Sequence, residues 1–299
     1  MYKKILITGV NGQVGHVLNE LLNDSTARIV SLNRAELDLS NQDQIRHIVQ
    51  SIKPDLVINP AAYTTVDRAE SEPELAYAIN ATAPRVFAEE SAKIGARLIH
   101  FSTDYVYNGK KSGAYIETDQ TEPLSVYGKS KLAGEDAIRQ IGVPHLIFRT
   151  SWVYGAYGKN FLKTILRLAS EREELRIVAD QYGAPTSATS IASAVSQLIQ
   201  SWHNDTSGIY HMVNNGRTTW HGFASAIVEE YVNSQADKGW PPLKVKSIKP
   251  ISTQEFPTPA TRPANSTLDT AKLEQDFSIQ LPDWREALKT EFDKLVLIG

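Results

Sequence analysis

The sequence predicts an α/β fold, a Rossmann-type doubly wound parallel sheet followed by a smaller C-terminal α/β domain. Two observations support this prediction. Short apolar runs alternate with helical patterns through the first half of the 299 residues, and a glycine-rich turn joins the first apolar run to the first helix. The runs are almost continuously apolar, as in strands that helices cover on both faces. Alternating strands and helices give right-handed crossovers and therefore a parallel sheet.

Five strands are expected in the first half, and in chain order they are Lys4–Thr8, Arg28–Leu32, Asp55–Asn59, Arg97–Ser102 and His145–Arg149. The helices between them are expected at Gln13–Leu22, after the cap-like segment Ser40–Asp43, and at Val126–Ile141. Ser71–Glu74 has the spacing of a capping box, which predicts that another helix begins there and runs toward Ile94.

The pattern changes after Tyr154. Strands are expected at Arg176–Val178 and Gly208–Val213, and helices at Asn160–Glu171, Ser187–Trp202, Thr219–Asn233 and Asp283–Leu295. Prolines cluster between positions 241 and 263, which predicts a loop-rich stretch. We expect one domain to contain residues 1–154 and about 187–222, and a second to contain about 155–186 and 223–299 and to cover the carboxyl edge of the sheet.

The composition excludes several classes of function. Lys and Arg number 31 against 34 Asp and Glu, with no basic cluster, so neither nucleic acid nor an anionic membrane surface is an expected partner. The chain has no cysteine, which excludes disulfides, thiolate metal sites and a cysteine nucleophile. No apolar stretch is long enough to span a bilayer, and the first residues already resemble a strand rather than a signal peptide. A cytoplasmic protein is expected.

The first expected strand leads into three glycines, Gly9, Gly12 and Gly15, spaced G-x-x-G-x-x-G. Such a turn lets a diphosphate approach the backbone closely, and the third glycine lets the following helix pack against the strand. An ordinary glycine turn is the alternative, but the position between a strand and a helix favours dinucleotide binding. The residues between the glycines are then expected to line the cofactor, namely Asn11, Gln13 and Val14.

The end of the second strand distinguishes NAD from NADP in such folds, because a carboxylate there binds the ribose 2′-hydroxyl whereas an arginine suits a 2′-phosphate. Here Asn33 and Arg34 follow the strand, and the nearest acids are Glu36 and Asp38. Asn33 carries no charge that would repel a phosphate, and Arg34 can pair with one. NADPH is therefore the preferred cofactor. NADH stays open because Arg34 is nearly as well explained as a solvated surface charge.

Tyr127 and Lys131 have the spacing Y-x-x-x-K within an expected helix and so lie on the same side of it. Reduction of a ketone by hydride requires a proton for the developing alkoxide, and a lysine ammonium beside a tyrosine lowers the pKa of the phenol. Thr103, after the fourth strand, can bind the same carbonyl oxygen. A second Y-x-x-x-K, which begins at Tyr107, contains the turn dipeptide Asn-Gly and is not expected to be helical.

Five further segments are distinctive, and they are Ala61–Glu70 (AAYTTVDRAE), Ser102–Tyr107 (STDYVY), Arg149–Tyr154 (RTSWVY), Asp180–Thr186 (DQYGAPT) and Pro257–Pro263 (PTPATRP). With the glycine turn and the Tyr–Lys pair, they resemble the dTDP-4-dehydrorhamnose reductases, a family of the extended short-chain dehydrogenase/reductase superfamily. The resemblance runs from the glycine turn to Arg262 and is expected to extend to the C-terminal helix. The last two segments are much more specific than the glycine spacing.

The resemblance implies an oxidoreductase that transfers hydride from NADPH or NADH to C4 of dTDP-6-deoxy-L-lyxo-4-hexulose and so gives dTDP-L-rhamnose, the last step of dTDP-rhamnose biosynthesis. It implies Tyr127 as the proton donor, with Thr103 and Lys131 as catalytic partners. Together with the glycine turn, Asn33 and Arg34, the implied cofactor contacts are Asp38, Leu39, Ala61, Ala62, Tyr63, Ser102, Tyr127 and Lys131. The implied substrate contacts are Thr64, Val66, Thr103, Asp104, Tyr105, Trp152 and Arg262.

Trp152 follows the fifth strand and is expected to wall the deoxysugar, and the guanidinium of Arg262 suits the phosphate oxygens of the nucleotide. The alternatives are a core aromatic for Trp152 and a surface ion pair for Arg262. Some members of the family dimerise through magnesium and carry glutamates at positions that hold Val17 and Thr189 here. Neither side chain is a ligand for a hard cation, so we expect no bridging metal and a monomer.

The histidines lack metal-ligand spacing, and His100 and His145, inside apolar strands, are expected in the core. Two other functions remain open. A related reductase or epimerase for another nucleotide sugar would use the same Tyr–Lys pair and fold. A non-catalytic, NADP-binding regulatory subunit is the second, although binding alone does not require Thr103, Tyr127 and Lys131 together.

Overall fold

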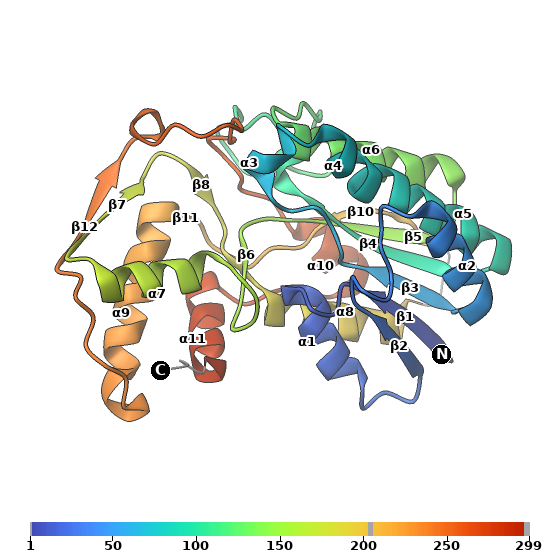
Figure 1. Ribbon diagram of the computed structural model, residues 1–299, viewed down its shortest axis with the longest axis horizontal. Helices are drawn as coiled ribbons and strands as arrows, with labels where there is room; N and C mark the ends of the chain where they lie inside the picture. Colours follow the sequence, from blue (N-terminus) through green and yellow to red (C-terminus); the bar gives the residue numbers. More distant parts are fainter. Residues whose placement is uncertain (1, 203–205, 296–299) are drawn as a thin grey trace.

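The computed structural model describes residues 2–202 and 206–295. Its centre is a six-stranded parallel sheet in the order β2, β1, β3, β4, β5, β10 (Figure 1). The strands are β1 (Lys4–Thr8), β2 (Arg28–Leu32), β3 (Leu56–Asn59), β4 (Arg97–Thr103), β5 (His145–Thr150) and β10 (Gly208–His211). These strands confirm the expected ones to within about a residue, except that β10 ends at His211 rather than at the expected Val213.

The strand order reverses at β1, which pairs with β2 on one side and with β3 on the other. Parallel sheets bind ligands at such a switch point, outside the carboxyl ends of the strands. Thr8 and Asn59 are the last residues of β1 and β3. Their side chains therefore stand at the floor of the expected cofactor site.

Helices cover both faces of the sheet, which confirms the doubly wound prediction (Figure 1). One face packs against α1 (Gln13–Leu22), α8 (Ala188–Ser201) and α10 (Ala271–Phe277). The other packs against α2 (Gln42–Ile52), α5 (Ala83–Ile94) and α6 (Val126–Ile141). Alternation along β1 sends Ile5 and Ile7 into the first core and Leu6 into the second.

The helix expected to run toward Ile94 is present but irregular. It consists of α4 (Pro73–Tyr77), a π-helical turn labelled η1 (Ala78–Thr82), and α5. The expected capping box is wrong. The helix begins at Pro73, whose fixed φ suits a first helical turn, and the Ser71 hydroxyl donates instead to the carbonyl of Arg68 at 3.0 Å. The π turn adds one residue to the helix and brings the buried Asn80 against α6.

A second hydrophobic core lies beside the sheet, at the left of Figure 1. It is enclosed by α7 (Phe161–Glu171), α9 (Trp220–Lys238), α11 (Trp284–Lys294) and the parallel pair β7 (Glu174–Val178) and β12 (Ser247–Ile251). The expected helices are confirmed, with Asn160, Thr219 and Asp283 as their N-caps. Helix α9 continues beyond the expected Asn233 to Lys238, where Gly239 ends it with a φ of +64°.

The chain passes between the two cores more than once. After β12 in the second core, Leu273 on α10 and the following Ile279 and Leu281 pack beneath the main sheet, and α11 then returns to the second core. The division into a domain of residues 1–154 and about 187–222 and a domain of about 155–186 and 223–299 stays a prediction.

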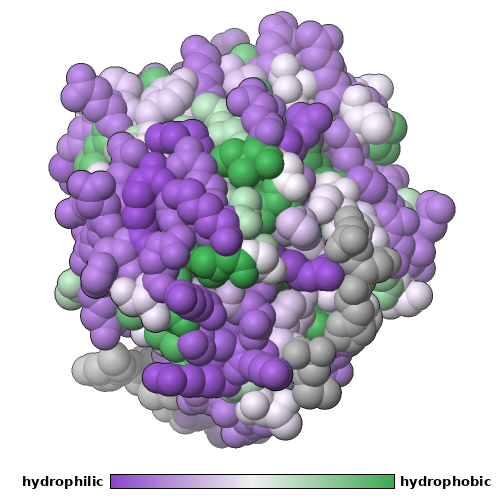
Figure 2. Space-filling model, turned by 90° about the vertical axis from the view of Figure 1, so that its right-hand side faces the viewer, coloured by the Kyte–Doolittle hydropathy of each residue, from purple (hydrophilic) through white to green (hydrophobic). Residues whose placement is uncertain are grey.

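The surface on the sheet side is mainly polar. Figure 2 shows that face as largely hydrophilic, with hydrophobic side chains in small groups separated by polar ones. Within residues 2–202 and 206–295, no helix is long and apolar enough to cross a membrane.

Candidate active site

The glycine turn forms a tight cradle at the end of β1. Gly9 has a φ of +60°, a conformation that glycine adopts without strain. A Cβ at Gly9 would lie 2.8 Å from the Cβ of Ala61, and a Cβ at Gly15 would lie 2.3 Å from the carbonyl oxygen of Gly9. Only glycine fits at these two positions, and α1 begins directly after Gly12. The cradle, with free helical N–H groups at its edge, fits the diphosphate of a dinucleotide.

The residues between the glycines have different surroundings. Asn11 is exposed, and Val14 packs against the core beneath the sheet. The amide of Gln13 donates to the carbonyl of Val153 at 3.3 Å and accepts from Nδ2 of Asn160 at 3.0 Å. The side chain of Gln13 therefore connects the glycine turn to the start of α7.

The turn after β2 presents one exposed cation. The side-chain oxygen of Asn33 accepts from the N–H of Ala35 at 2.8 Å, and Glu36 accepts from the N–H of Asn33 at 2.8 Å, so both groups are used to shape the turn. Arg34 is left exposed. Asp38 accepts from the N–H and hydroxyl of Ser40, which hold the pKa of its carboxyl below the usual range. Leu39 is buried beside these carboxylates.

Tyr127 lies in the first turn of α6, which is anchored at its start. The Ser125 hydroxyl caps the helix by accepting from the N–H of Gly128 at 3.2 Å, and Glu70 accepts from the N–H of Val126 at 2.8 Å. Tyr105 packs edge-on against Tyr127 with ring centroids 5.5 Å apart. The phenol therefore has a fixed position beside the carboxyl end of β4.

Burial raises the pKa of the Tyr127 phenol to about 12, although a hydrogen bond with Thr103 opposes the rise. The expectation that Lys131 lowers this pKa is wrong in this structure. The Nζ of Lys131 donates to the carbonyl of Phe101 at 2.6 Å, and the loss of water around the phenol outweighs any nearby positive charge. The phenol is therefore protonated at neutral pH, as a proton donor is before it reacts, but burial makes it a weaker acid than an ordinary tyrosine.

Lys131 lies over a chain of buried polar side chains that the sequence did not reveal. Its Nζ lies 3.4 Å from Nε2 of His100, the Nδ1 of His100 lies 3.2 Å from Nδ2 of Asn59, and Asn59 accepts from the Thr8 hydroxyl at 2.6 Å. Burial lowers the pKa of Lys131 to about 8, and Glu135 opposes this shift. His100 and His145 are buried, as expected, but His100 also faces Lys131. A histidine in an apolar strand, three positions before Thr103, was the available signal.

Asn80 is a second residue that sequence reasoning missed. Its side chain accepts from the N–H of Tyr63 at 2.8 Å and donates to the Tyr63 carbonyl at 3.0 Å and to the Ser130 hydroxyl at 3.0 Å. Asn80 therefore joins the segment Ala61–Tyr63, which packs on the glycine turn, to the helix that carries Tyr127. A polar residue within the mainly apolar run Ala76–Ala83 was the available hint.

The carboxyl end of β4 carries the other polar groups of the site. The Thr103 hydroxyl donates to Asp104 at 3.0 Å. Burial raises the pKa of Asp104 to about 6, and its Oδ2 has no hydrogen-bond partner among the described residues. The Ser102 hydroxyl donates to Glu135, which pairs with Arg149 beneath the strand end. Ser102 is thus held below the expected cofactor site rather than open to it.

The expected substrate residues fall into two groups. Val66, at the start of α3 (Val66–Ala69), packs with Tyr105 and Tyr127, and Arg262 lies beside Tyr105. Trp152 lies apart from them, stacked on Trp220 near β8 (Tyr182–Gly183) and β11 (Thr218–Thr219). Thr64 is exposed between β3 and α3.

The second Y-x-x-x-K is not helical, as expected. Gly109 has a φ of +73°, Lys111 pairs with Asp119, and the Tyr107 hydroxyl accepts from Arg149 at 2.7 Å. Tyr107 therefore belongs to the buried network of Arg149 rather than to the reacting groups.

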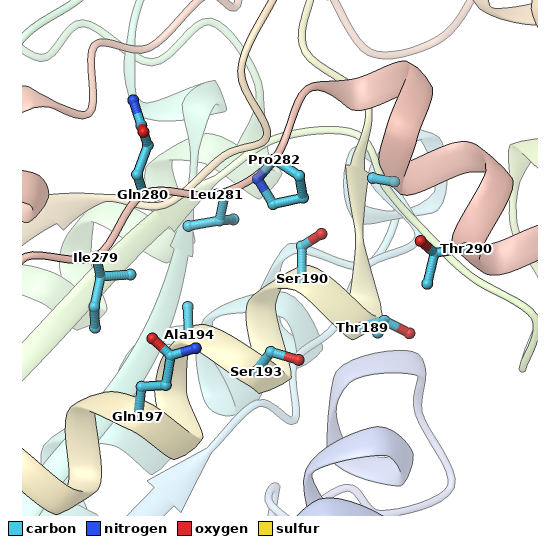
Figure 3. Close-up of a pocket in the computed structure, with 11 residues that line it drawn as sticks. Thr189, Ser190, Ser193, Ala194, Gln197, Ile279, Gln280, Leu281, Pro282 and Thr290 are labelled. Atoms are coloured by element: carbon cyan, nitrogen blue, oxygen red, sulfur yellow. The ribbon is translucent and has the colours of Figure 1, made fainter.

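The two positions that carry glutamate ligands of magnesium in some reductases hold uncharged residues here, Val17 and Thr189. Val17 is buried in α1. Thr189 lines a cavity of about 230 Å³ with Ser190, Ser193 and Gln197 of α8, facing the segment before α11 (Figure 3). None of the residues that line this cavity is acidic. Across the ranges 2–202 and 206–295, no three His, Cys, Asp or Glu side chains are grouped to hold a metal.

The comparisons with known proteins agree over nearly the whole chain. The family model described as RmlD substrate binding domain matches residues 3–297. The dTDP-4-dehydrorhamnose reductase of Burkholderia thailandensis is 49% identical over 291 residues, 95% of this chain and 96% of the relative. The protein of that name from Escherichia coli K12 is 45% identical over 297 residues, 97% of each chain.

A solved structure shows the same fold. The crystal structure of the dTDP-4-dehydrorhamnose reductase from Bacillus anthracis, in complex with NADP, has a TM-score of 0.90 to this chain at 40% identity, covering 98% of this chain and 100% of the other. The sequence match and the shared fold agree. The chain belongs to the dTDP-4-dehydrorhamnose reductase family.

Proposed function

We propose that this protein uses NADPH to reduce the C4 ketone of dTDP-6-deoxy-L-lyxo-4-hexulose to dTDP-L-rhamnose, the last step of dTDP-rhamnose biosynthesis. The observation that carries the proposal is a buried tyrosine, Tyr127, that hydrogen-bonds with Thr103 at the carboxyl end of β4. The relatives' shared name supports this substrate. NADP in the Bacillus anthracis structure supports the cofactor, and NADH is the weaker candidate.

The residues divide the chemistry between them. The hydride comes from NADPH when the cofactor is bound. Gly9, Gly12 and Gly15 would hold its diphosphate, and Lys131 would bind the nicotinamide ribose. Tyr127 donates its proton to O4 of the sugar as negative charge develops there, and the Thr103 hydroxyl binds the same oxygen. The phenolate that results takes a proton back from solvent before the next turnover.

The substrate would lie between the two groups of residues described above. Arg262 presents a planar guanidinium suited to the diphosphate. The unpartnered Oδ2 of Asp104 is an acceptor for a sugar hydroxyl, since a buried carboxylate oxygen otherwise lacks a donor. The indole of Trp152 would wall the apolar side of the deoxysugar.

We infer that the protein is a cytoplasmic monomer. Val17 and Thr189 support the monomer, because neither offers a carboxylate for a bridging cation. The proposed reaction supports the location, because reduced dinucleotides and nucleotide sugars are metabolites of the cytoplasm. Light scattering of the purified protein and fractionation of cells that express it test the two statements separately.

The decisive test is NADPH oxidation by the purified protein, supplied with the 4-keto sugar made in situ from dTDP-glucose. We expect oxidation that yields dTDP-L-rhamnose, and slower oxidation when NADH replaces NADPH. NADPH binding without oxidation would reject this substrate and favour another nucleotide sugar or the regulatory role.

A further inference from the structure

The segment Asp180–Thr186 contains none of the proposed catalytic residues, yet it surrounds Trp152. A Cβ at Gly183 would lie 2.6 Å from Cε2 of the Trp152 indole. The N–H of Thr186 donates to the carbonyl of Trp152 at 3.2 Å, and the Ser151 hydroxyl donates to the carbonyl of Ala184 at 3.0 Å. The segment is therefore shaped around this one tryptophan.

Trp152 has an unusual backbone conformation. Its φ is +48°, in the left-handed region, which a bulky residue adopts only where its surroundings impose it. Such residues concentrate at ligand sites, where the conformation aims a side chain in a direction that the strand alone would not give. Something must therefore hold the indole in place.

The side chain that holds it is Trp220. The two indole rings are stacked with centroids 3.6 Å apart and planes inclined by 12°. The pairing of β8 with β11 places Gly183 opposite Thr218, two residues before Trp220 at the start of α9. The missing side chain of Gly183 leaves the space that the indole of Trp152 occupies.

Trp220 is itself fixed in position. Its indole N–H donates to Oε1 of Gln181 at 3.2 Å, and Nε2 of Gln181 donates to the hydroxyl of Thr253 at 3.0 Å. The carboxylate of Asp180 accepts from the N–H of Thr253 at 2.9 Å. On another side, Phe161 packs against Trp220 with centroids 4.6 Å apart. The first two residues of the segment thus orient Trp220, and its glycine makes room for Trp152.

We propose that Trp220 is a positioning residue that holds the indole of Trp152 as the wall of the deoxysugar subsite. The inference rests on the proposed function, in which Trp152 contacts the sugar. It predicts that the affinity for the sugar depends on Trp220, which does not touch the nucleotide. Replacing the Trp220 side chain should therefore weaken the binding of a dTDP-sugar and leave the binding of dTDP unchanged.

The test is calorimetric titration of the Trp220→Leu variant with dTDP-L-rhamnose and, separately, with dTDP. We expect binding of dTDP-L-rhamnose to weaken by about tenfold, as for the loss of one well-placed aromatic pair. We expect the Kd for dTDP to stay as in the wild type. Trp240→Leu is the matched control, because Trp240 stacks on Tyr231 in the same core, 5.0 Å between centroids, away from Trp152. Wild-type affinities in Trp220→Leu, or equal losses for both ligands, would overturn the inference.

Two further variants keep the inference testable if Trp220→Leu does not fold. Gly183→Ala places a methyl group where the indole of Trp152 lies and should cause the same selective loss while Trp220 is intact. Trp220→Phe keeps an aromatic face and should bind dTDP-L-rhamnose nearly as the wild type does. Strong dTDP-L-rhamnose binding by Gly183→Ala would contradict the inference.

A double-mutant cycle of Trp152→Phe and Trp220→Leu measures the coupling directly. Losses that are less than additive support one shared wall, and additive losses contradict it. Failure of the proposed function looks different, because the wild type would then not reduce the keto sugar or bind dTDP-L-rhamnose more tightly than dTDP.

Discussion

The carboxylate of Asp67 accepts a hydrogen bond from the guanidinium of Arg262 at 2.7 Å, although the two residues are 195 positions apart. Asp67 also accepts from the N–H of Ala260 at 3.2 Å. This pair fastens the proline-framed loop to α3, and Arg262 holds the pKa of the Asp67 carboxyl below its usual range. A guanidinium has five N–H donors, and this one also donates to the carbonyl of Ala260 at 3.3 Å. The remaining N–H groups are the ones proposed to bind phosphate oxygens.

Replacing Arg262 by lysine keeps the charge and removes the planar fork. We expect the KM for the dTDP-sugar to rise roughly tenfold to a hundredfold, as for the loss of a charge-assisted hydrogen bond, with kcat nearly unchanged. Steady-state kinetics with each substrate varied in turn measures this. An equal rise in the KM for NADPH would place Arg262 at the cofactor instead.

Tyr127→Phe removes the proposed proton donor and leaves the ring in place. We expect kcat to fall by about 10²- to 10⁴-fold, the usual contribution of general acid catalysis, while NADPH still binds. Stopped assays of turnover and fluorescence titration with NADPH measure the two effects. Tyr2→Phe is the control, because the Tyr2 hydroxyl donates to the carbonyl of Trp202 at 2.9 Å, on the opposite face of the sheet. Unchanged turnover in Tyr127→Phe would reject the mechanism.

Arg34→Ala tests the choice of cofactor. Arg34 is the exposed cation after β2, where the 2′-phosphate of NADPH would lie. We expect the ratio of kcat/KM for NADPH to that for NADH to fall by about tenfold, because a charged hydrogen bond to phosphate is lost. A ratio that does not change would mean that Arg34 is only a solvated surface charge.

Gly134→Ala tests the close contact between α6 and the π turn. A Cβ at Gly134 would lie 2.2 Å from the carbonyl oxygen of Asn80. Alanine normally stabilises a helix relative to glycine by about 1 kcal/mol, but the clash should outweigh this and destabilise the protein by about 1–3 kcal/mol. Urea unfolding measures the change. Gly113→Ala, where nothing lies within 4 Å of the added Cβ, should leave stability almost unchanged.

Asp104→Asn tests the buried carboxyl group. Burial raises the pKa of Asp104 from 3.8 to about 6, so the folded state binds this proton more tightly than the unfolded state. The contribution of this proton to the stability of the folded state is fully present below pH 3.8 and is lost as the pH rises through about 6. Asparagine carries no such proton. The stability of the variant relative to the wild type should therefore increase between about pH 4 and about pH 7, by up to about 3 kcal/mol. Urea unfolding at both pH values measures this, and a constant difference would contradict it.

Most of the fold could be predicted from the sequence because strands covered on both faces are continuously apolar. Helices such as Gln13–Leu22 and Val126–Ile141 agree residue for residue with the structure. The start of α4 was predicted wrongly because a capping pattern at Ser71 competes with the stronger preference of Pro73 for a first turn. The π turn escaped prediction because contacts between Asn80 and α6, distant in sequence, determine it.

The site was predictable where its residues are close together in the sequence. The sequence placed three residues in one site, namely Tyr127 and Lys131 by their spacing and Thr103 by its position at a strand end. The structure shows all three side chains buried. The pKa of Tyr127 was predicted in the wrong direction, because burial depends on how Tyr105 and α3 pack around the ring. The contact of His100 with Lys131 was invisible for the same reason, since it joins two elements through the tertiary fold.

The π-helical turn at Ala78–Thr82 also makes the length of this helix a determinant of activity. Deleting one residue there would let the helix continue as a regular α-helix, so the chain would still fold. One residue corresponds to about 100° of rotation, which would turn Asn80 away from Ser130 and from Tyr63. The segment Ala61–Tyr63, which packs on the glycine turn, would lose its hydrogen-bonded connection through Asn80 to the helix that carries Tyr127. Deleting one residue from this turn should therefore abolish turnover in a protein that remains folded.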